Sequence, residues 1–317
     1  MRISSLAKLI GGELLNHTIT EQIEGFCFNS SNATRQNAYF ALHGDALDMR
    51  AAVQNGAYCI ITDLDITPFD NEIAFIKVVD LRLSIYRLAR YYATQKELRF
   101  ASINALDFDI LKHISGDFTL LSGDFGEIFR VIEKSPRHGL IFSNDFALLE
   151  KISFELLNIA PKKADIIKQN SLFFSDFEFN GARYSLQFPR FFIDELCGVL
   201  GFLQEQGVSF KLKDFKDFAH FRALFVGANN TPTSFGASQK AFICENDEHI
   251  FSTFCASLKG KMPLCAPLHR GLKCADISFA SLGELKKLRN FTYALVLCEY
   301  DELYEALNTK EQGEFLF

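Results

Sequence analysis

Short apolar runs of strand type alternate with helical patterns through the first hundred residues, and this alternation constrains the fold more than any other feature. Strand-type runs fall at residues 39–42, 58–62 and 75–79. Residues 81–92 then place apolar side chains on one face at helical spacing. Strands that alternate with helices at this spacing predict an α/β domain.

The first residues predict a short helix. Ser4 or Ser5 is placed to cap it, and the pair Gly11-Gly12 is placed to end it. We expect an extended stretch at residues 26–28 and a polar loop after it.

The last hundred residues predict a second α/β unit. Strand patterns at residues 241–244, 277–279 and 294–298 alternate with helical ones. Such a unit is Rossmann-like, with a small parallel sheet. It contains no G-x-G-x-x-G sequence, so it carries no prediction of a bound dinucleotide.

Polar residues mark helix starts in this last part. Ser281 and Glu284 form a capping-box pattern, which predicts a helix at residues 282–288. Asp301 is placed to cap a final helix at residues 302–307.

The middle of the chain, from about residue 98 to 218, is less regular. Residues 173–179 and 184–188 predict a β-hairpin, because Asn180-Gly181 between them suits a two-residue turn. Residues 191–204 are amphipathic and predict a helix.

Composition excludes several classes of function. The formal charge is -6 at pH 7 and no basic cluster provides a footprint for nucleic acid. No apolar run reaches the roughly 18 residues that a membrane span needs, and the N-terminus lacks the pattern of a signal peptide. We therefore expect a cytoplasmic protein with no nucleic-acid partner and no membrane span.

The eight cysteines form no C-x-x-C pair and most lie in apolar patterns. This usage is typical of reduced thiols in the cytosol. Cys265, His269 and Cys274 have poor spacing for a zinc site, so no metal is expected.

Residues 4–93 resemble the N-terminal domain of the Mur ligases, closest to the types that add the third residue or the D-alanyl-D-alanine dipeptide. The stretch SLAKLIGGEL resembles the family's first helix, and FNSSNATRQNAYFALHGDALD resembles its uridine-binding stretch. Within the second stretch, Phe40-Ala41-Leu42, Gly44 and Asp48 match the family's Phe-x-Ala-Leu strand, Gly and Asp. The resemblance implies a domain of the type that binds a UDP-sugar. It places candidate substrate-binding residues at Asn29, Ser30, Ser31, Gly44 and Asp48.

The chain departs from the family at this site. The acidic-Ser/Thr-Arg triplet falls at Asn29-Ser30-Ser31 or one residue later, and neither register keeps the arginine; Arg35 is out of register. The family's Gly-His is Met49-Arg50 here. The resemblance therefore does not extend to the arginine that would make a charge-assisted hydrogen bond to phosphate.

The larger departure concerns ATP. The family continues with a Gly-x-x-Gly-Lys-Thr/Ser loop, whose amides and lysine hold the phosphates. Here the corresponding stretch is LRFASINALDFDILKHISG, with no Gly-Lys pair. Residues 123–127, GDFGE, are acidic and are interpreted as a loop with a tight turn.

The layout beyond residue 97 follows the family loosely. The hairpin region and the stretch ANNTPTSF resemble the end of its central domain and the start of its C-terminal domain. We expect a Mur ligase-like N-terminal domain at residues 1–97, a truncated central domain at 98–218 without a P-loop, and a Rossmann-like C-terminal domain at 219–317.

The leading hypothesis is a catalytically degenerate Mur ligase homologue of cell-wall synthesis. It would bind a UDP-N-acetylmuramoyl peptide or another Mur enzyme, and it would hold no cofactor. The alternative is an ATP-dependent ligase with an altered or trans-supplied nucleotide site, which would need ATP and magnesium. A third reading is a remnant kept for protein contact. The paired acids Asp107/Asp109 and Asp194/Glu195 are interpreted as surface groups, and His220 as a satisfied core histidine. The sequence does not predict an oligomeric state.

Overall fold

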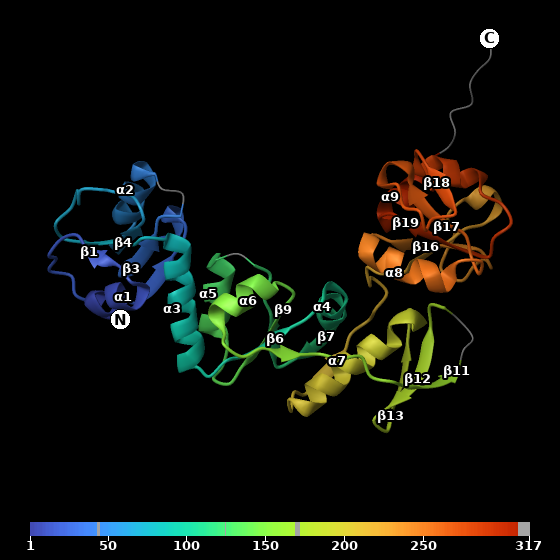
Figure 1. Cartoon of the computed structure of the whole chain (residues 1–317), viewed down its shortest axis with the longest axis horizontal. Helices are drawn as coiled ribbons and strands as arrows, with labels where there is room; N and C mark the ends of the chain where they lie inside the picture. Colours follow the sequence, from blue (N-terminus) through green and yellow to red (C-terminus); the bar gives the residue numbers. More distant parts are fainter. Residues whose placement is uncertain (43–44, 124, 169–171, 310–317) are drawn as a thin grey trace, which may run out of the picture. The chain divides into compact units, whose positions relative to one another are not determined.

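The computed structural model describes residues 1–42, 45–123, 125–168 and 172–309. The chain divides into two compact units, one of residues 1–108 with 116–159 and the other of 109–115 with 160–317. The predicted domain boundaries at residues 97 and 218 remain predictions. Figure 1 labels the helices and strands of both units.

The first unit opens with a five-stranded sheet in the order β1-β5-β4-β3-β2. Strands β2 to β5 run parallel and β1 is antiparallel to β5. The strands are β1 (Glu13–Leu14), β2 (Gly25–Cys27), β3 (Asn37–Phe40), β4 (Ala57–Thr62) and β5 (Ala74–Lys77). The helices are α1 (Ile3–Ile10), α2 (Ala46–Gln54) and α3 (Leu81–Gln95), with a 3-10 turn η1 (Ser30–Asn32).

Successive side chains on these strands enter different cores, as the two-residue repeat of a strand requires. Phe40 and Ile61 pack with α1 and α3, whereas Tyr39, Ile60 and Phe75 pack with α2. A strand buried on both faces reads as a continuous apolar run, which is why residues 39–42, 58–62 and 75–79 were recognisable in the sequence.

The opening helix differs from its prediction at the start and agrees at the end. Its N-cap is Arg2, not Ser4 or Ser5, and no side chain caps it. The helix starts early because Arg2 forms a β-bridge with Gln22 and the amide of Ile3 donates to Glu21. Gly11 ends the helix in the left-handed region, with φ 71°.

A four-stranded parallel sheet, in the order β10-β6-β9-β8, completes the first unit. Its strands are β6 (Arg99–Ser102), β8 (Phe118–Leu120), β9 (Leu140–Ser143) and β10 (Leu157–Asn158). The helices that follow strands here are α4 (Ala105–Lys112), which continues into the second unit from residue 109, α5 (Phe125–Lys134) and α6 (Phe146–Ile152). Residues 125–127 of the sequence GDFGE, which was interpreted as a loop, instead form the first turn of α5.

The second unit begins with the predicted hairpin. Strands β11 (Asp165–Lys168), β12 (Ser175–Phe179) and β13 (Ala182–Leu186) form an antiparallel sheet. Asn180 and Gly181 have φ of 50° and 75°, as a primed two-residue turn requires. The predicted amphipathic helix is α7 (Ile193–Glu205), preceded by η2 (Arg190–Phe192), and β7 (Ile114–Gly116) pairs with β14 (Phe210–Leu212).

The last sheet has the order β15-β16-β19-β17-β18, in which only the edge strand β15 runs antiparallel. The strands are β15 (Arg222–Phe225), β16 (Ala241–Glu245), β17 (Leu264–Pro267), β18 (Ile277–Phe279) and β19 (Tyr293–Leu297). The helices are α8 (Glu248–Leu258) and α9 (Tyr300–Asn308), with turns η3 (Ala228–Asn230), η4 (Leu268–Arg270) and η5 (Leu282–Lys287). The expected parallel sheet with helices is therefore present.

Two helix starts in this sheet region were predicted wrongly. Ser281 makes no side-chain cap, and the segment after it is the 3-10 helix η5 rather than an α-helix. The final helix begins at Tyr300, so Asp301 lies in its first turn instead of capping it. An acidic residue in a first turn still suits the helix dipole.

Candidate ligand-binding site

The turn after β2 organises the predicted substrate-binding residues. Asn29 caps η1, and its Oδ1 accepts hydrogen bonds from the amide of Ser31 at 3.0 Å and from the Ser31 Oγ at 2.7 Å. An asparagine that binds its own backbone two residues on fixes the turn locally. The Asn29 and Ser31 side chains therefore hold one another at the surface.

Ser30 and Asp48 also meet, although β3 separates them in the sequence and Asp48 lies on α2. The Ser30 Oγ donates to Asp48 Oδ1 at 2.6 Å, and the Tyr39 hydroxyl donates to Asp48 Oδ2 at 3.0 Å. Burial, followed by the hydrogen bond to Asp48, raises the pKa of Tyr39 well above its ordinary value. The structure thus brings Asn29, Ser30, Ser31 and Asp48 together, while Gly44 lies outside the described residues.

A cavity of about 490 Å³ opens beside Asn29. It lies beyond the carboxyl ends of β2 and β3, the edge where parallel sheets commonly bind ligands. Phe28 and Phe129 form an aromatic wall, with ring centroids 5.2 Å apart, and Phe26 lies 5.7 Å from Phe129. A volume in this range suits a small organic ligand.

Polar side chains edge the same cavity. Asn29 and Asn32 approach from η1, whereas Arg130 and Glu133 come from α5. The Arg130 guanidinium is 3.5 Å from Glu127, and its side chain is 61% exposed. This half-open site therefore offers amides, one guanidinium and ring faces.

Sequence reasoning missed the α5 side of this cavity. Phe129 and Arg130 lie about a hundred residues beyond η1, so no local motif joins them. The recurrence of apolar residues at Ile128, Phe129 and Ile132 was a signal for a helix there.

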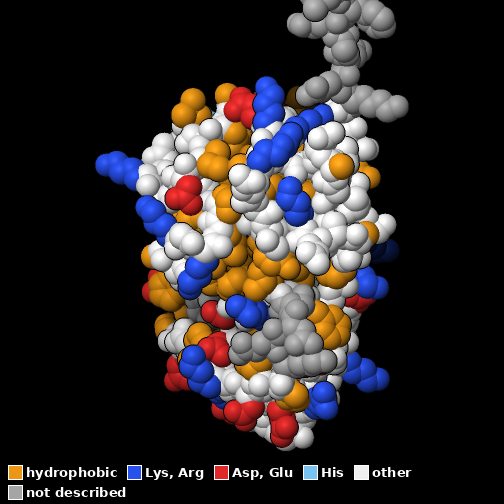
Figure 2. Space-filling model, turned by 90° about the vertical axis from the view of Figure 1, so that its right-hand side faces the viewer, with side chains coloured by type: hydrophobic (Ala, Val, Ile, Leu, Met, Phe, Trp, Pro, Cys, Tyr) orange, Lys and Arg blue, Asp and Glu red, His pale blue; other side chains and the backbone are white. Residues whose placement is uncertain are grey.

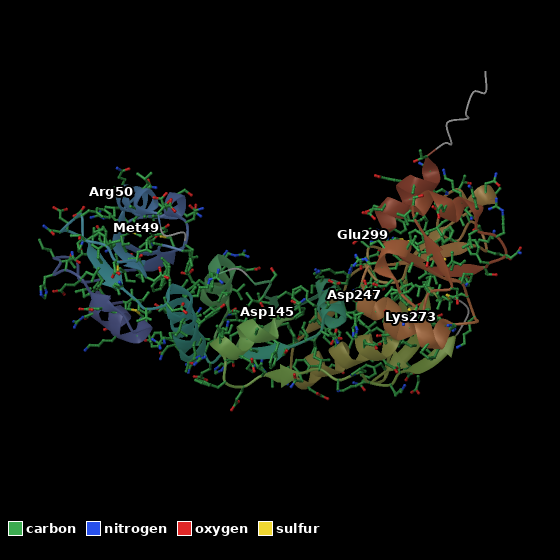
Figure 3. All side chains as sticks on the ribbon, turned by 45° about the horizontal axis from the view of Figure 1, so that its top comes forward. Met49, Arg50, Asp145, Asp247, Lys273 and Glu299 are labelled. Carbon is green, nitrogen blue, oxygen red and sulfur yellow. The ribbon has the colours of Figure 1, made fainter. Side chains whose placement is uncertain are left out.

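The positions that differ from the family's Gly-His lie on α2 (Figure 3). Met49 is buried in the core beneath the sheet. The Arg50 guanidinium lies 4.3 Å from the centroid of the Phe69 ring. Both residues therefore support packing of α2.

The connection from β6 to α4 lies in the stretch that was expected, from the sequence resemblance, to correspond to the ATP loop of the Mur ligases. It consists of Ile103 and Asn104 alone. The Ile103 amide donates to Ser143, and Asn104 caps α4 through the Asp107 amide at 2.8 Å. Asp107 is buried in the first turn, so it disfavours an anion at this helix start.

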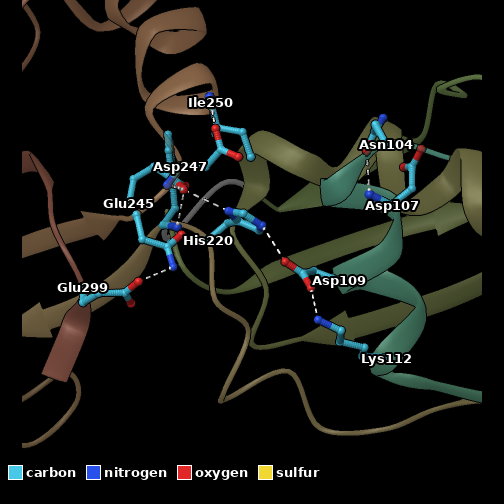
Figure 4. Close-up of polar contacts among 11 residues, drawn as sticks. Asn104, Asp107, Asp109, Lys112, His220, Glu245, Asp247, Ile250 and Glu299 are labelled. Carbon is cyan, nitrogen blue, oxygen red and sulfur yellow. Dashed lines mark hydrogen bonds and ion pairs between the residues drawn. The ribbon is translucent and has the colours of Figure 1, made fainter. Parts of the chain in front are cut away.

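A buried histidine is clamped between two carboxylates in the second unit (Figure 4). His220 Nδ1 is 2.9 Å from Glu245 Oε1, and Nε2 is 3.0 Å from Asp109 Oδ2. Burial lowers the pKa of His220, but the hydrogen bonds and charges of Asp109 and Glu245 override it and raise the pKa to about 9. The interpretation of His220 as a satisfied core residue agrees with this geometry, whereas Asp109 is no free surface acid.

The carboxyl edge of the last parallel sheet is acidic. A cavity of about 420 Å³ there is lined by Glu248, Glu299 and Glu302. Arg270 pairs with Glu248 at 3.3 Å, and Asn246 donates to Glu299 at 2.9 Å. This edge disfavours phosphate.

The remaining sequence candidates differ in their surroundings. Glu195, interpreted as a surface group, instead has an Oε2 that is buried without a hydrogen-bond partner in the described ranges of the chain, and burial raises the pKa of its carboxyl. Asp194 pairs with Lys163 at 2.7 Å. Asn230, in the stretch ANNTPTSF, is buried and donates to the carbonyls of Leu285 and Leu288. Among the described residues, no group of three or more His, Cys, Asp or Glu side chains is placed to hold a metal.

The described part of the chain contains no helix long and apolar enough to cross a bilayer. No family model matches the sequence. No curated protein matches it either.

Solved structures match over most of the chain. A MurF ligase from Thermotoga maritima in complex with ADP aligns with TM-score 0.51 and 10% identity, over 90% of this chain and 96% of that one. The MurF ligase of Acinetobacter baumannii aligns with TM-score 0.49 and 12% identity, over 96% and 97% of the two chains. A UDP-N-acetylmuramoyl-L-alanyl-D-glutamate–2,6-diaminopimelate ligase gives TM-score 0.44 and 10% identity, over 93% of each.

The chain is thus an α/β protein with several parallel and mixed sheets. Its fold resembles that of the Mur ligases, through the match to the Thermotoga enzyme. At this identity the likeness concerns the fold alone.

Proposed function

We propose that this protein acts in peptidoglycan synthesis as a Mur ligase homologue that binds a UDP-N-acetylmuramoyl peptide and does not itself form the peptide bond. The cavity between η1 and α5 carries the proposal. Asn29, one of the residues that the family resemblance assigns to the sugar nucleotide, lines it. Ser30 and Ser31 belong to the same turn, and Ser30 is hydrogen-bonded to Asp48.

The cavity suits the uridine diphosphate end of such a ligand. Phe28 and Phe129 offer ring faces on which a base stacks. The amides of Asn29 and Asn32 suit the edge of a pyrimidine, and the Arg130 guanidinium suits a diphosphate. The muramoyl peptide would extend into solvent, since the site is half open.

The connection between β6 and α4 supports the absence of ligation. A phosphate cradle needs several free amides in a row and a lysine. Two residues without glycine, an Asn104 cap and a buried Asp107 provide neither. Without that cradle the chain does not activate a carboxylate as an acyl phosphate.

Isothermal titration of the full chain with UDP-N-acetylmuramoyl tripeptide tests binding. Arg130→Gln removes the guanidinium at the cavity, and we expect the affinity to fall about tenfold, because a charge-assisted hydrogen bond contributes roughly 1.5–3 kcal/mol. Lys134→Gln removes the same charge from the exposed end of α5 and is the matched control. Equal affinities of the two variants would contradict the site, and no binding to the parent chain would contradict the function and favour a protein-contact role.

The alternative is an ATP-dependent UDP-N-acetylmuramoyl-peptide ligase with an altered or trans-supplied nucleotide site. The alignment over 96% of an ADP-bound ligase favours it. Phosphate release from ATP that depends on both the muramoyl peptide and D-alanyl-D-alanine would establish it. Release only after a second Mur enzyme is added would indicate a partner that supplies the nucleotide site.

A further inference from the structure

An aromatic cavity of about 290 Å³ in the second unit is separate from the candidate site. It is lined by the β13 end, the stretch 215–225 and the loop before β16, together with Phe173 ahead of β12 and Tyr300 at the start of α9. Hydrophobic side chains gather across the middle of the face shown in Figure 2.

Rings form most of its wall. The Phe225 and Phe235 centroids are 4.9 Å apart at 65°, and Phe173 and Phe225 are 5.8 Å apart at 74°. Phe173 and Phe225 are buried, whereas Phe235 is 53% exposed. An exposed phenylalanine at the rim of an aromatic cavity offers a ring face to a ligand.

One guanidinium faces the same cavity. Arg222 lies 3.7 Å from the centroid of the Tyr300 ring, and its nearest carboxylate oxygen, on the exposed Asp217, is 3.6 Å away. The Arg222 side chain is 31% exposed and donates no hydrogen bond to another of the residues that the structure describes. A guanidinium fixed by stacking, with N–H groups to spare, is suited to an oxyanion.

We propose that this cavity binds a small aromatic oxyanion, with its ring against the exposed Phe235 and its carboxylate or phosphate on Arg222. The cations that line the cavity also favour a negatively charged ligand. Lys216 adds a second cation, which pairs with Asp214 at 2.9 Å, and Asp217, the carboxylate in the lining, has a side chain that is 88% exposed. The site goes beyond the proposed function, since it shares no residue with the cavity at η1.

The test uses 2-naphthoate as the probe, titrated into the full chain by fluorescence and calorimetry. We expect saturable binding of one naphthoate per chain. The amine 2-naphthylmethylamine has the same rings and the opposite charge, and it should not displace naphthoate. Cyclohexanecarboxylate keeps the carboxylate without the aromatic ring, and it should bind at least tenfold more weakly.

Two variants locate the site. Arg222→Gln should weaken naphthoate about tenfold, whereas Arg183→Gln, an exposed arginine on β13 outside the cavity, should leave it unchanged. Phe235→Ala removes a half-exposed ring at the rim, so it disturbs folding less than a substitution of buried Phe225, and it should also weaken binding. No saturable binding, equal binding of the amine, or unchanged affinity in both cavity variants would overturn the proposal. Titration with phenyl phosphate then separates a carboxylate ligand from a phosphate one.

Discussion

His220 should make the stability of the second unit depend on pH in the alkaline direction. Both ring nitrogens face carboxylates, so the imidazole satisfies Asp109 and Glu245 together only when it carries a proton on each nitrogen. The neighbouring charges are those of Asp109, Glu245 and Lys112, which pairs with Asp109 in turn. Replacing His220 with glutamine removes the charge and one of the two donors.

The magnitude follows from the raised pKa. The pKa of His220 rises from 6.5 to about 9, and each unit corresponds to about 1.4 kcal/mol, so the clamp contributes on the order of 3 kcal/mol. Little of this is screened by solvent, because the side chain is 4% exposed. The folded pKa is above the unfolded one, so this stability is fully present below pH 6.5 and is lost as pH rises to about 9.

Urea unfolding followed by circular dichroism, at pH 6, 7, 8 and 9 and constant ionic strength, measures this dependence. The unfolding free energy of the parent should fall relative to that of His220→Gln by about 3 kcal/mol across this range. His17→Gln, at an exposed histidine, should keep the slope of the parent. An imidazole titration by NMR with a pKa at or below 6.5, or identical slopes for parent and His220→Gln, would refute the reasoning.

Three further predictions concern stability. Asn230→Ala should cost about 2–3 kcal/mol in urea unfolding, because it leaves the Leu285 and Leu288 carbonyls without the buried amide that both bind; a loss under 0.5 kcal/mol would contradict this. Gly181→Ala should cost roughly 1 kcal/mol, since φ is 75° at this turn; a neutral Gly181→Ala would argue against the primed turn. Asp145→Ala should lower the melting temperature through the loss of about 1 kcal/mol, because the carboxylate caps α6 at the Leu148 amide; an unchanged melting curve would exclude the cap.

Strands were predictable where apolar runs are buried on both faces, as at residues 58–62 and 241–244. The hairpin turn was predictable because a two-residue primed turn needs positive φ angles, here 50° and 75°, which an Asn-Gly pair adopts readily. Helix starts were not, since tertiary contacts decide them: a β-bridge at Arg2 moves the first start to Ile3. At η5, the side-chain amide of Asn230 donates hydrogen bonds to the carbonyls of Leu285 and Leu288, near the end of the segment.

The candidate sites were predictable only in their local part. Asn29 and Ser31 lie two residues apart and belong to one motif. Arg130 reaches the same cavity from α5, and Asp109 reaches His220 across 111 residues of sequence. Such partners are set by the fold and leave no local pattern.

The most direct test of the central claim is calorimetric titration with UDP-N-acetylmuramoyl tripeptide, run with and without ATP and magnesium, with phosphate release followed in the same samples. The account predicts saturable binding of the sugar nucleotide, an affinity that ATP does not change, and no phosphate release after addition of D-alanyl-D-alanine. Phosphate release by the purified chain alone that requires both substrates would contradict it.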